Sequence, residues 1–201
     1  MGIAGRGLDY RSFRGEEIRK ASDDLAALRI TVFRDFPYLY DGNTEYEKEY
    51  LQTYINSENA LLFSVFDGEK MVGATTCIPL AHEKADVQEP FLQKGMNINR
   101  IFYFGESILL KDYRGLGLGH RFFEERETHA ASFPTVDTFC FCAVRRPPAH
   151  PLRPGDYQAL DAFWARWGYV KADDMVSYFE WKDLDEEAPS AKPMEYWFKK
   201  I

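Results

Sequence analysis

Cysteine, histidine and long apolar runs are scarce in this chain of 201 residues, and each scarcity excludes a class of protein. The three cysteines, Cys77, Cys140 and Cys142, form no Cys-x-x-Cys pair, and no histidine lies near them at zinc-finger spacing. Neither a disulfide framework nor a structural metal site is therefore predicted. We expect reduced thiols, no bound metal and a cytoplasmic location.

Membrane and nucleic-acid proteins are disfavoured by two further absences. No apolar run approaches the roughly 20 residues that a membrane-spanning helix needs. The segment from Met1 to Leu8 also lacks the apolar core of a signal peptide. The formal net charge of -7 argues against a nucleic-acid partner that would be bound through many phosphate contacts. A local basic patch can still bind one anionic ligand.

Apolar and aromatic residues are abundant, at 45% and 16% of the chain, which is enough for a substantial core in one domain. Residues 8–13 alternate like a short edge strand, and acidic residues then open a helical stretch that ends at Pro37. A second helix is predicted over 44–55. Two β-rich runs, 60–66 and 71–80, flank an Asp-Gly turn and predict a hairpin.

The second half of the chain alternates strands and helices. We predict a strand over 101–110, a helix over 119–131, a strand over 138–144 and a helix over 157–167 that ends at Gly168, followed by strands at 175–181 and 194–198. The polar interval 81–100 has only a weak helical pattern at Val87, Phe91 and Leu92, so it is interpreted as an insertion or loop over the site.

Three alternating glycines lie between the strand 101–110 and the helix 119–131, in the sequence Arg114-Gly115-Leu116-Gly117-Leu118-Gly119-His120. We call residues 114–119 the glycine turn. Several backbone N–H groups of such a turn can point at one anion beside the positive end of a helix dipole. The other interpretation is tight strand-to-helix packing with no ligand. His120 follows where a Walker A loop needs Lys, and the Gly-x-Gly-x-x-Gly spacing of a dinucleotide fold is absent.

The glycine turn resembles the Arg/Gln-x-x-Gly-x-Gly/Ala signature of the GNAT (GCN5-related N-acetyltransferase) family, and the order of elements resembles that family over nearly the whole chain. The resemblance implies an α/β (α+β) fold in one domain, 1–201, with an insertion at about 81–100 and a tail strand at about 193–199. Its central sheet would be mixed, mostly antiparallel and splayed between strands 101–110 and 138–144, with helices on both faces.

The same resemblance implies acetyl-CoA as cosubstrate, bound in the splay. The backbone of Ser107, Ile108 and Leu109 would contact pantetheine and thioester. The pyrophosphate would be bound by Arg114, Gly115, Leu116, Gly117, Leu118, Gly119 and His120.

Glu106 is the candidate catalytic base, because it interrupts an apolar strand at a position where many GNAT proteins have a carboxylate. Burial among aromatic residues would raise its pKa toward the working pH. The alternative is that Glu106 only pairs with a cation or orients the amine. Strand alternation predicts that Phe102, Phe104, Glu106 and Ile108 share one face.

The general acid is unassigned, because Phe163-Trp164 stands where many GNAT members have Phe-Tyr, and an indole does not donate a proton at ordinary pH. Tyr157 or a water could protonate the thiolate, or it could leave unaided. Arg145-Arg146-Pro147-Pro148 also replaces an asparagine that is often present. A CoA-binding regulatory module without turnover is therefore an alternative, and a purely structural or interaction domain is a third.

Several residues beside the expected cleft keep two interpretations. Cys142 is either an acyl-accepting nucleophile or, as we favour, a core residue. Arg145, Arg146 and His150 either bind the adenosine 3′-phosphate or an acidic acceptor, or belong to a solvated loop. Aromatic residues of the helical arm either wall an acceptor pocket or pack in the core; they are Phe36, Tyr38, Tyr40, Tyr46, Tyr50 and Tyr54.

The resemblance, together with these residues, predicts transfer of an acetyl group from acetyl-CoA to a primary amine of an unidentified acceptor by direct attack in a ternary complex. The acceptor is a small molecule or a peptide or protein amine, and a homodimer is one possible assembly.

Overall fold

The first half of the chain folds as the local patterns predict. The computed structural model describes residues 7–201. It begins with β1 (Asp9–Arg14), the 3-10 helix η1 (Gly15–Ala21), α1 (Ser22–Phe33) and α2 (Thr44–Ile55), followed by the hairpin of β2 (Leu61–Asp67) and β3 (Lys70–Pro79). Asn43 caps α2 by accepting a hydrogen bond from the N–H of Tyr46 at 2.9 Å, which explains why that helix begins at Thr44.

The second half supplies the remaining strands and the helices of the other face. In order, it forms η2 (Leu80–His82), α3 (Ala85–Gln93), η3 (Ile98–Arg100), β4 (Ile101–Leu109), η4 (Lys111–Tyr113), α4 (Leu118–Ala131), β5 (Thr138–Val144), α5 (Asp161–Arg166), β6 (Val170–Trp181) and β7 (Ser190–Lys200). The connection between β6 and β7 lies beside the connection between α1 and α2, where Tyr40 and Asp183 form an isolated antiparallel bridge.

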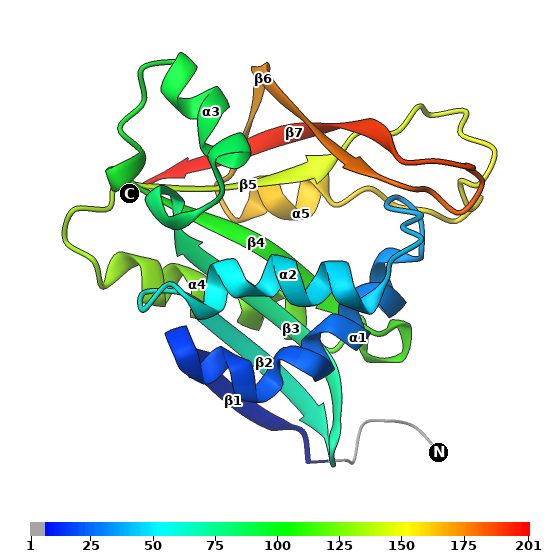
Figure 1. Cartoon of the computed structure of the whole chain (residues 1–201), viewed down its shortest axis with the longest axis horizontal. Coiled ribbons are helices and arrows are strands. Elements are labelled where there is room, and N and C mark those ends of the chain that lie inside the picture. The colour runs from blue at the N-terminus through cyan, green and yellow to red at the C-terminus, as the bar shows by residue number, and fades with distance from the viewer. Residues whose placement is uncertain (1–6) are drawn as a thin grey trace.

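All seven strands belong to one sheet, in the order β1-β2-β3-β4-β5-β7-β6 (Figure 1). Only β4 and β5 are parallel, so the predicted mixed, mostly antiparallel sheet is confirmed. These two strands pair over Ile101–Tyr103 and residues 138–140 alone. Beyond Tyr103 they separate, which is the splay that the sequence predicts.

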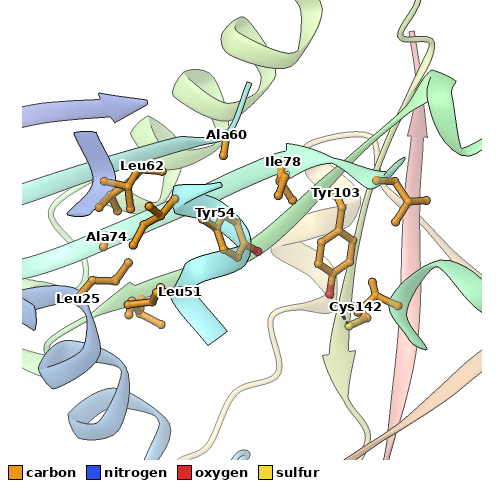
Figure 2. Close-up of a cluster of buried hydrophobic side chains, with 14 of the residues drawn as sticks. Leu25, Leu51, Tyr54, Ala60, Leu62, Ala74, Ile78, Tyr103 and Cys142 are labelled. Carbon is orange, nitrogen blue, oxygen red and sulfur yellow. Dashed lines mark hydrogen bonds between the residues drawn. The ribbon is translucent and has the colours of Figure 1, made fainter. Parts of the chain in front are cut away.

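Helices cover both faces of the sheet, with α1 and α2 on one and α4 on the other (Figure 1). Leu25 and Leu51 face Leu62 and Ala74 in the core under α1 and α2 (Figure 2). A second buried cluster, which includes Phe104, Phe123 and Phe139, lies under α4. The division into one domain with an inserted segment stays a prediction.

The last two strands are longer than predicted, at Val170–Trp181 and Ser190–Lys200, and two other predicted segments differ in kind. The helix expected over 157–167 begins only at Asp161, because Tyr157 N–H bonds to Pro154 O at 3.1 Å and ends a turn there. The interval 81–100 contains α3, whose Phe91 packs on Tyr196 and Phe198 of β7. It therefore covers the β7 side of the sheet and is not merely a loop.

The predicted alternation along β4 is wrong, because β4 contains a bulge. Thr75 pairs with Ser107 but Cys77 pairs with Phe104, so Gly105 and Glu106 together oppose Thr76. The extra residue changes the face of every side chain after it. Phe102 and Phe104 pack under α4, whereas Glu106 contacts α1 and α2.

Candidate functional site

Glu106 is part of a buried cluster of two carboxylates and one guanidinium. Arg29 of α1 donates from Nη1 to Glu106 Oε2 and from Nε to Glu47 Oε2 of α2. Tyr50 donates its hydroxyl to Glu106 Oε2 at 3.3 Å, and its ring lies 4.1 Å below the guanidinium. The side chains of Glu47 and Glu106 have no solvent exposure. When both carboxyls are ionised, the cluster has an excess negative charge.

Both interpretations of Glu106 have a physical basis in this cluster. Burial raises the pKa of Glu106, and the adjacent Arg29 opposes that rise. The ion pair with Arg29 is the cation pairing that the sequence left as an alternative. The Thr76 hydroxyl is near enough to lower the pKa of the Glu106 carboxyl. Oε1 of Glu106 is buried and has no partner of good hydrogen-bond geometry among residues 7–201, so it can accept a further donor.

Two threonines of β3 hold the bulged backbone around Glu106 by hydrogen bonds. Thr75 donates its hydroxyl to Glu106 O at 2.7 Å, and Glu106 N–H donates to Thr76 Oγ1 at 3.3 Å. Ser107, Ile108 and Leu109 then pair only with β3, since β5 has already separated. The edge of β4 that faces the splay therefore has no strand partner at these three residues.

The glycine turn leads from η4 into α4 with two glycines in the left-handed region. Gly115 has φ 77° and Gly117 has φ 82°, a conformation that costs other L-residues energy. Gly117 is the N-cap of α4 and provides no side-chain cap. The first N–H groups of a helix have no intrahelical partner, so the start of α4 presents uncapped donors. This geometry suits an anion.

Arg114 and His120 are both held by protein partners beside this turn. Arg114 donates from Nε and Nη2 to Leu109 O, each at 3.3 Å, and so joins the turn to the end of β4. His120 Nδ1 accepts from the Trp167 indole at 3.2 Å, and its ring lies 5.0 Å from that of Phe163. The structure thus brings the end of β4, the turn and α5 together.

Trp164 and Tyr157 have different environments. Trp164 is partly buried and packs against Phe141 and Trp197 at the margin of the cluster under α4, with ring centroids at 5.1 Å in each case. Tyr157 packs edge-on against Phe36 of the α1–α2 connection at 4.6 Å. Burial raises the pKa of Tyr157. Its hydroxyl therefore stays protonated at neutral pH, as a proton donor must.

Arg146 is neither a solvated residue nor a free anion ligand. It donates to Asp183 from Nη1 and Nη2 at 2.5 and 2.9 Å, to Pro37 O at 2.7 Å and to Tyr38 O at 2.7 Å. Its side chain is only 8% exposed. Arg146 thus ties the α1–α2 connection to the β6–β7 connection. Sequence reasoning missed this role, since its partners are 37 or more positions away.

Cys142, His129 and His82 have the surroundings of structural residues. Burial raises the pKa of Cys142 to about 12, so it is a neutral thiol at physiological pH, as the core interpretation requires. His129 contacts Asn59 O at 2.8 Å, and His82 contacts Ser57 Oγ at 2.7 Å.

Residues 7–201 contain no group of three or more potential metal ligands. No helix in that part of the chain is long and apolar enough to cross a bilayer.

Several solved structures that are similar to this chain are described as acetyltransferases. An acetyltransferase from Thermus thermophilus has a TM-score of 0.56 at 16% identity, with 96% of this chain and 97% of that chain covered. A GNAT-family acetyltransferase from Streptococcus pneumoniae has a TM-score of 0.57 at 16% identity, covering 97% and 100%. Arabidopsis thaliana NAA60, solved with a bisubstrate analogue, has a TM-score of 0.57 at 11% identity, covering 97% and 99%.

The chain therefore has the fold of GNAT-family acetyltransferases, and the predicted resemblance is confirmed at the level of the fold. No protein-family model and no curated protein sequence matches the chain. At these identities the shared property is the fold alone, so activity has to be argued from the residues.

Proposed function

We propose that the protein is an N-acetyltransferase that transfers an acetyl group from acetyl-CoA to a primary amine by direct attack. The observation that supports this most strongly is the glycine turn. It joins the free edge of β4 to the uncapped start of α4, next to the point where β4 and β5 separate. Several similar solved structures are described as acetyltransferases, and that of Arabidopsis thaliana NAA60 contains a bisubstrate analogue.

In this proposal, the backbone N–H groups of Gly115 to Gly119 bind the pyrophosphate, with Arg114 and His120 at the margin. The backbone of Ser107, Ile108 and Leu109 binds the pantetheine and polarises the thioester carbonyl. No metal takes part. These assignments follow the position of each residue along β4, the turn and α4.

Glu106 removes a proton from the acceptor ammonium, through its unpartnered Oε1 or a bridging water. Its raised pKa suits this role. Tyr157 is our candidate for the group that protonates the departing thiolate. The excess negative charge of Arg29, Glu47 and Glu106 favours a cationic acceptor, either a small-molecule amine or a peptide amine.

A CoA-binding module without turnover is the second candidate. Two observations favour it: Trp164 packs against Phe141 and provides no acid, and Arg29 occupies Glu106 Oε2. Transfer and mere binding are separated by measuring free thiol released from acetyl-CoA across a panel of primary amines. Release that depends on the amine supports transfer. Stabilisation by acetyl-CoA with no release from any amine favours the module, and no stabilisation contradicts both.

A left-handed glycine inside the turn and one outside it give a matched pair of variants. Gly117→Ala places a Cβ residue at φ 82°, which costs about 1–2 kcal/mol unless the turn rearranges. We expect the Kd for acetyl-CoA to rise about ten-fold, measured by isothermal titration calorimetry. Gly95→Ala, after α3, is the control. It has φ 69° and no atom within 4 Å of its Cβ, so it has the same backbone strain outside the proposed site, and its Kd should be unchanged. Equal affinity in the two variants would remove the turn from the binding site.

A further inference from the structure

A continuous chain of hydrogen bonds leads from Glu106 to the carboxyl group of Glu83, which lies near the C-terminal end of α2. The Tyr50 hydroxyl lies 3.3 Å from Glu106 Oε2 and 3.1 Å from the Tyr54 hydroxyl. The Tyr54 hydroxyl lies 3.1 Å from Oε1 of Glu83. Tyr54, Glu83 and Glu106 are buried, and Tyr54 lies in the core below α2 (Figure 2). We call these four residues the relay chain.

The relay chain needs one more proton than its two tyrosines provide. It has three oxygen-to-oxygen links, but its two tyrosines provide only two hydroxyl protons. All three links are hydrogen bonds only when one of the two carboxyls is protonated. With the proton on Glu83, every O–H points toward Glu106; with the proton on Glu106, every O–H points toward Glu83. The two arrangements differ by one proton transferred between the ends.

Glu83 is suited to be the outer end. Its Oε2 accepts the N–H of Lys84 at 3.1 Å, which leaves Oε1 to exchange a proton with Tyr54. Burial raises the pKa of Glu83 to about 7, so it gains and loses a proton near neutral pH. Glu83 also lines a surface cavity of about 400 Å³, together with Thr53, Asn56, Ser57, His82 and Lys84.

Gly105 shows that the position of the Tyr54 hydroxyl depends on the sequence of β4. A Cβ at position 105 would lie 1.9 Å from Tyr54 Oη and 2.8 Å from Thr76 Oγ1. Contacts this short are impossible, so only glycine lets the hydroxyl lie against the bulge that presents Glu106. The bulge in β4 and the position of the Tyr54 hydroxyl in the relay chain therefore both depend on Gly105.

We propose that Tyr50, Tyr54 and Glu83 are the proton-exit route of Glu106 and connect it to the surface cavity. The proposal rests on the proposed transferase function. The ammonium N–H bond of the acceptor breaks and an O–H bond forms on Glu106. Because the chain starts with its shared proton on Glu83, Glu83 first releases that proton to water in the cavity, and the O–H groups of Glu106, Tyr50 and Tyr54 turn toward Glu83. Glu106 then donates to Tyr50, Tyr50 to Tyr54 and Tyr54 to Glu83, each hydroxyl passing on its own proton. One proton has then left for the one taken up, and the chain is back in its first state.

Other titratable and charged groups act on the two ends of the chain. Glu106 faces Arg29 of α1 and Glu47 of α2. Glu83 is affected by Glu106 of β4 and Asp86 of α3, and Tyr103 of β4 is close enough for its own pKa to be raised by Glu83. The buried thiols of β5, Cys140 and Cys142, are also influenced by Glu83, and His82 and Lys84 line the same cavity.

Infrared spectroscopy tests the shared proton without any turnover. In the wild-type protein, a protonated-carboxyl C=O band should disappear as the pH rises through about 7, and it should be missing in Glu83→Gln. Because the Tyr54 hydroxyl lowers the pKa of Glu83, Tyr54→Phe should move the midpoint to higher pH. Tyr10→Phe, on the exposed edge strand β1, is the control and should not move it. A midpoint unchanged by Tyr54→Phe, or a band that persists in Glu83→Gln, overturns the relay.

Kinetics test the exit route with the amine that gives the fastest thiol release. Tyr54→Phe should lower kcat about ten-fold or more and leave KM for acetyl-CoA unchanged, since the relay acts on the proton and not on the cofactor. Tyr10→Phe should keep the wild-type kcat. An unaltered kcat in Tyr54→Phe contradicts the relay while wild-type turnover supports the transferase. Absence of turnover in the wild type contradicts the transferase, and the infrared titration then decides the shared proton alone.

Discussion

Replacing Arg29 by methionine is expected to lower the free energy of unfolding by about 3–5 kcal/mol, the usual cost of removing one partner from a buried ion pair. Arg29 is the cation shared by Glu47 and Glu106, whose side chains have no solvent exposure. Methionine retains much of the volume but leaves two like charges buried side by side. Urea denaturation at neutral pH measures the loss.

The loss should depend on pH in a defined direction. Burial already raises the pKa of Glu106, and removing the guanidinium, which lowers it, raises it further. The folded variant then holds a proton that the unfolded chain releases. The loss of unfolding free energy in Arg29→Met is therefore smallest below the pKa of glutamate in the unfolded chain. It grows as the pH rises through the pKa of Glu106 in the folded variant. Arg19→Met, which removes an exposed pair with Glu16, is the control and should cost no more than about 1 kcal/mol. Equal losses in the two variants contradict the buried cluster.

Replacing Glu106 by glutamine is expected to lower kcat by about 10²–10⁴, the usual contribution of a general base. The acetyl-CoA Kd should stay the same, because the proposed cofactor contacts on β4 come from the backbone of the residues that follow. Glutamine has nearly the same shape and still accepts from Tyr50, but it cannot take up the ammonium proton. Stopped-flow or steady-state thiol release measures kcat, and calorimetry measures Kd.

The same variant separates the two interpretations of Glu106. If the carboxylate only pairs with Arg29, Glu106→Gln lowers the melting temperature and leaves kcat unchanged. Glu45→Gln, on the exposed side of α2, is the matched control for removing a carboxylate and should keep both kcat and stability. A wild-type rate in folded Glu106→Gln would remove Glu106 from the base role.

Features that depend on neighbouring residues could be predicted from the sequence. The hairpin of β2 and β3 follows from two β-rich runs around an Asp-Gly turn, and α2 has its predicted bounds because Asn43 caps it. The glycine turn lies where the sequence predicts it, between β4 and α4, with only η4 before it. In each case the signal lies within a few residues of the feature, so it survives without knowledge of the tertiary contacts.

Features that depend on residues far away in the chain could not be predicted from the sequence. The bulge in β4 reversed the face of Phe102 and Phe104 relative to Glu106, although an isolated glycine in a strand pattern, Gly105, is a known signal for a bulge. Arg29 follows Leu25 by four positions in an otherwise apolar stripe, which also marks it as unusual. Its partners Glu47 and Glu106 are 18 and 77 positions away, and no local pattern selects them.

The central claim is that the glycine turn binds the pyrophosphate of acetyl-CoA, and calorimetric titration with two ligands tests it most directly. Acetyl-CoA and acetyl-pantetheine share the thioester and the pantetheine arm, but only acetyl-CoA has the pyrophosphate. We expect wild-type protein to bind acetyl-CoA and to bind acetyl-pantetheine at least about ten-fold more weakly, with most of that difference lost in Gly117→Ala. No heat with acetyl-CoA, or equal affinity for the two ligands in the wild-type protein, would contradict the claim.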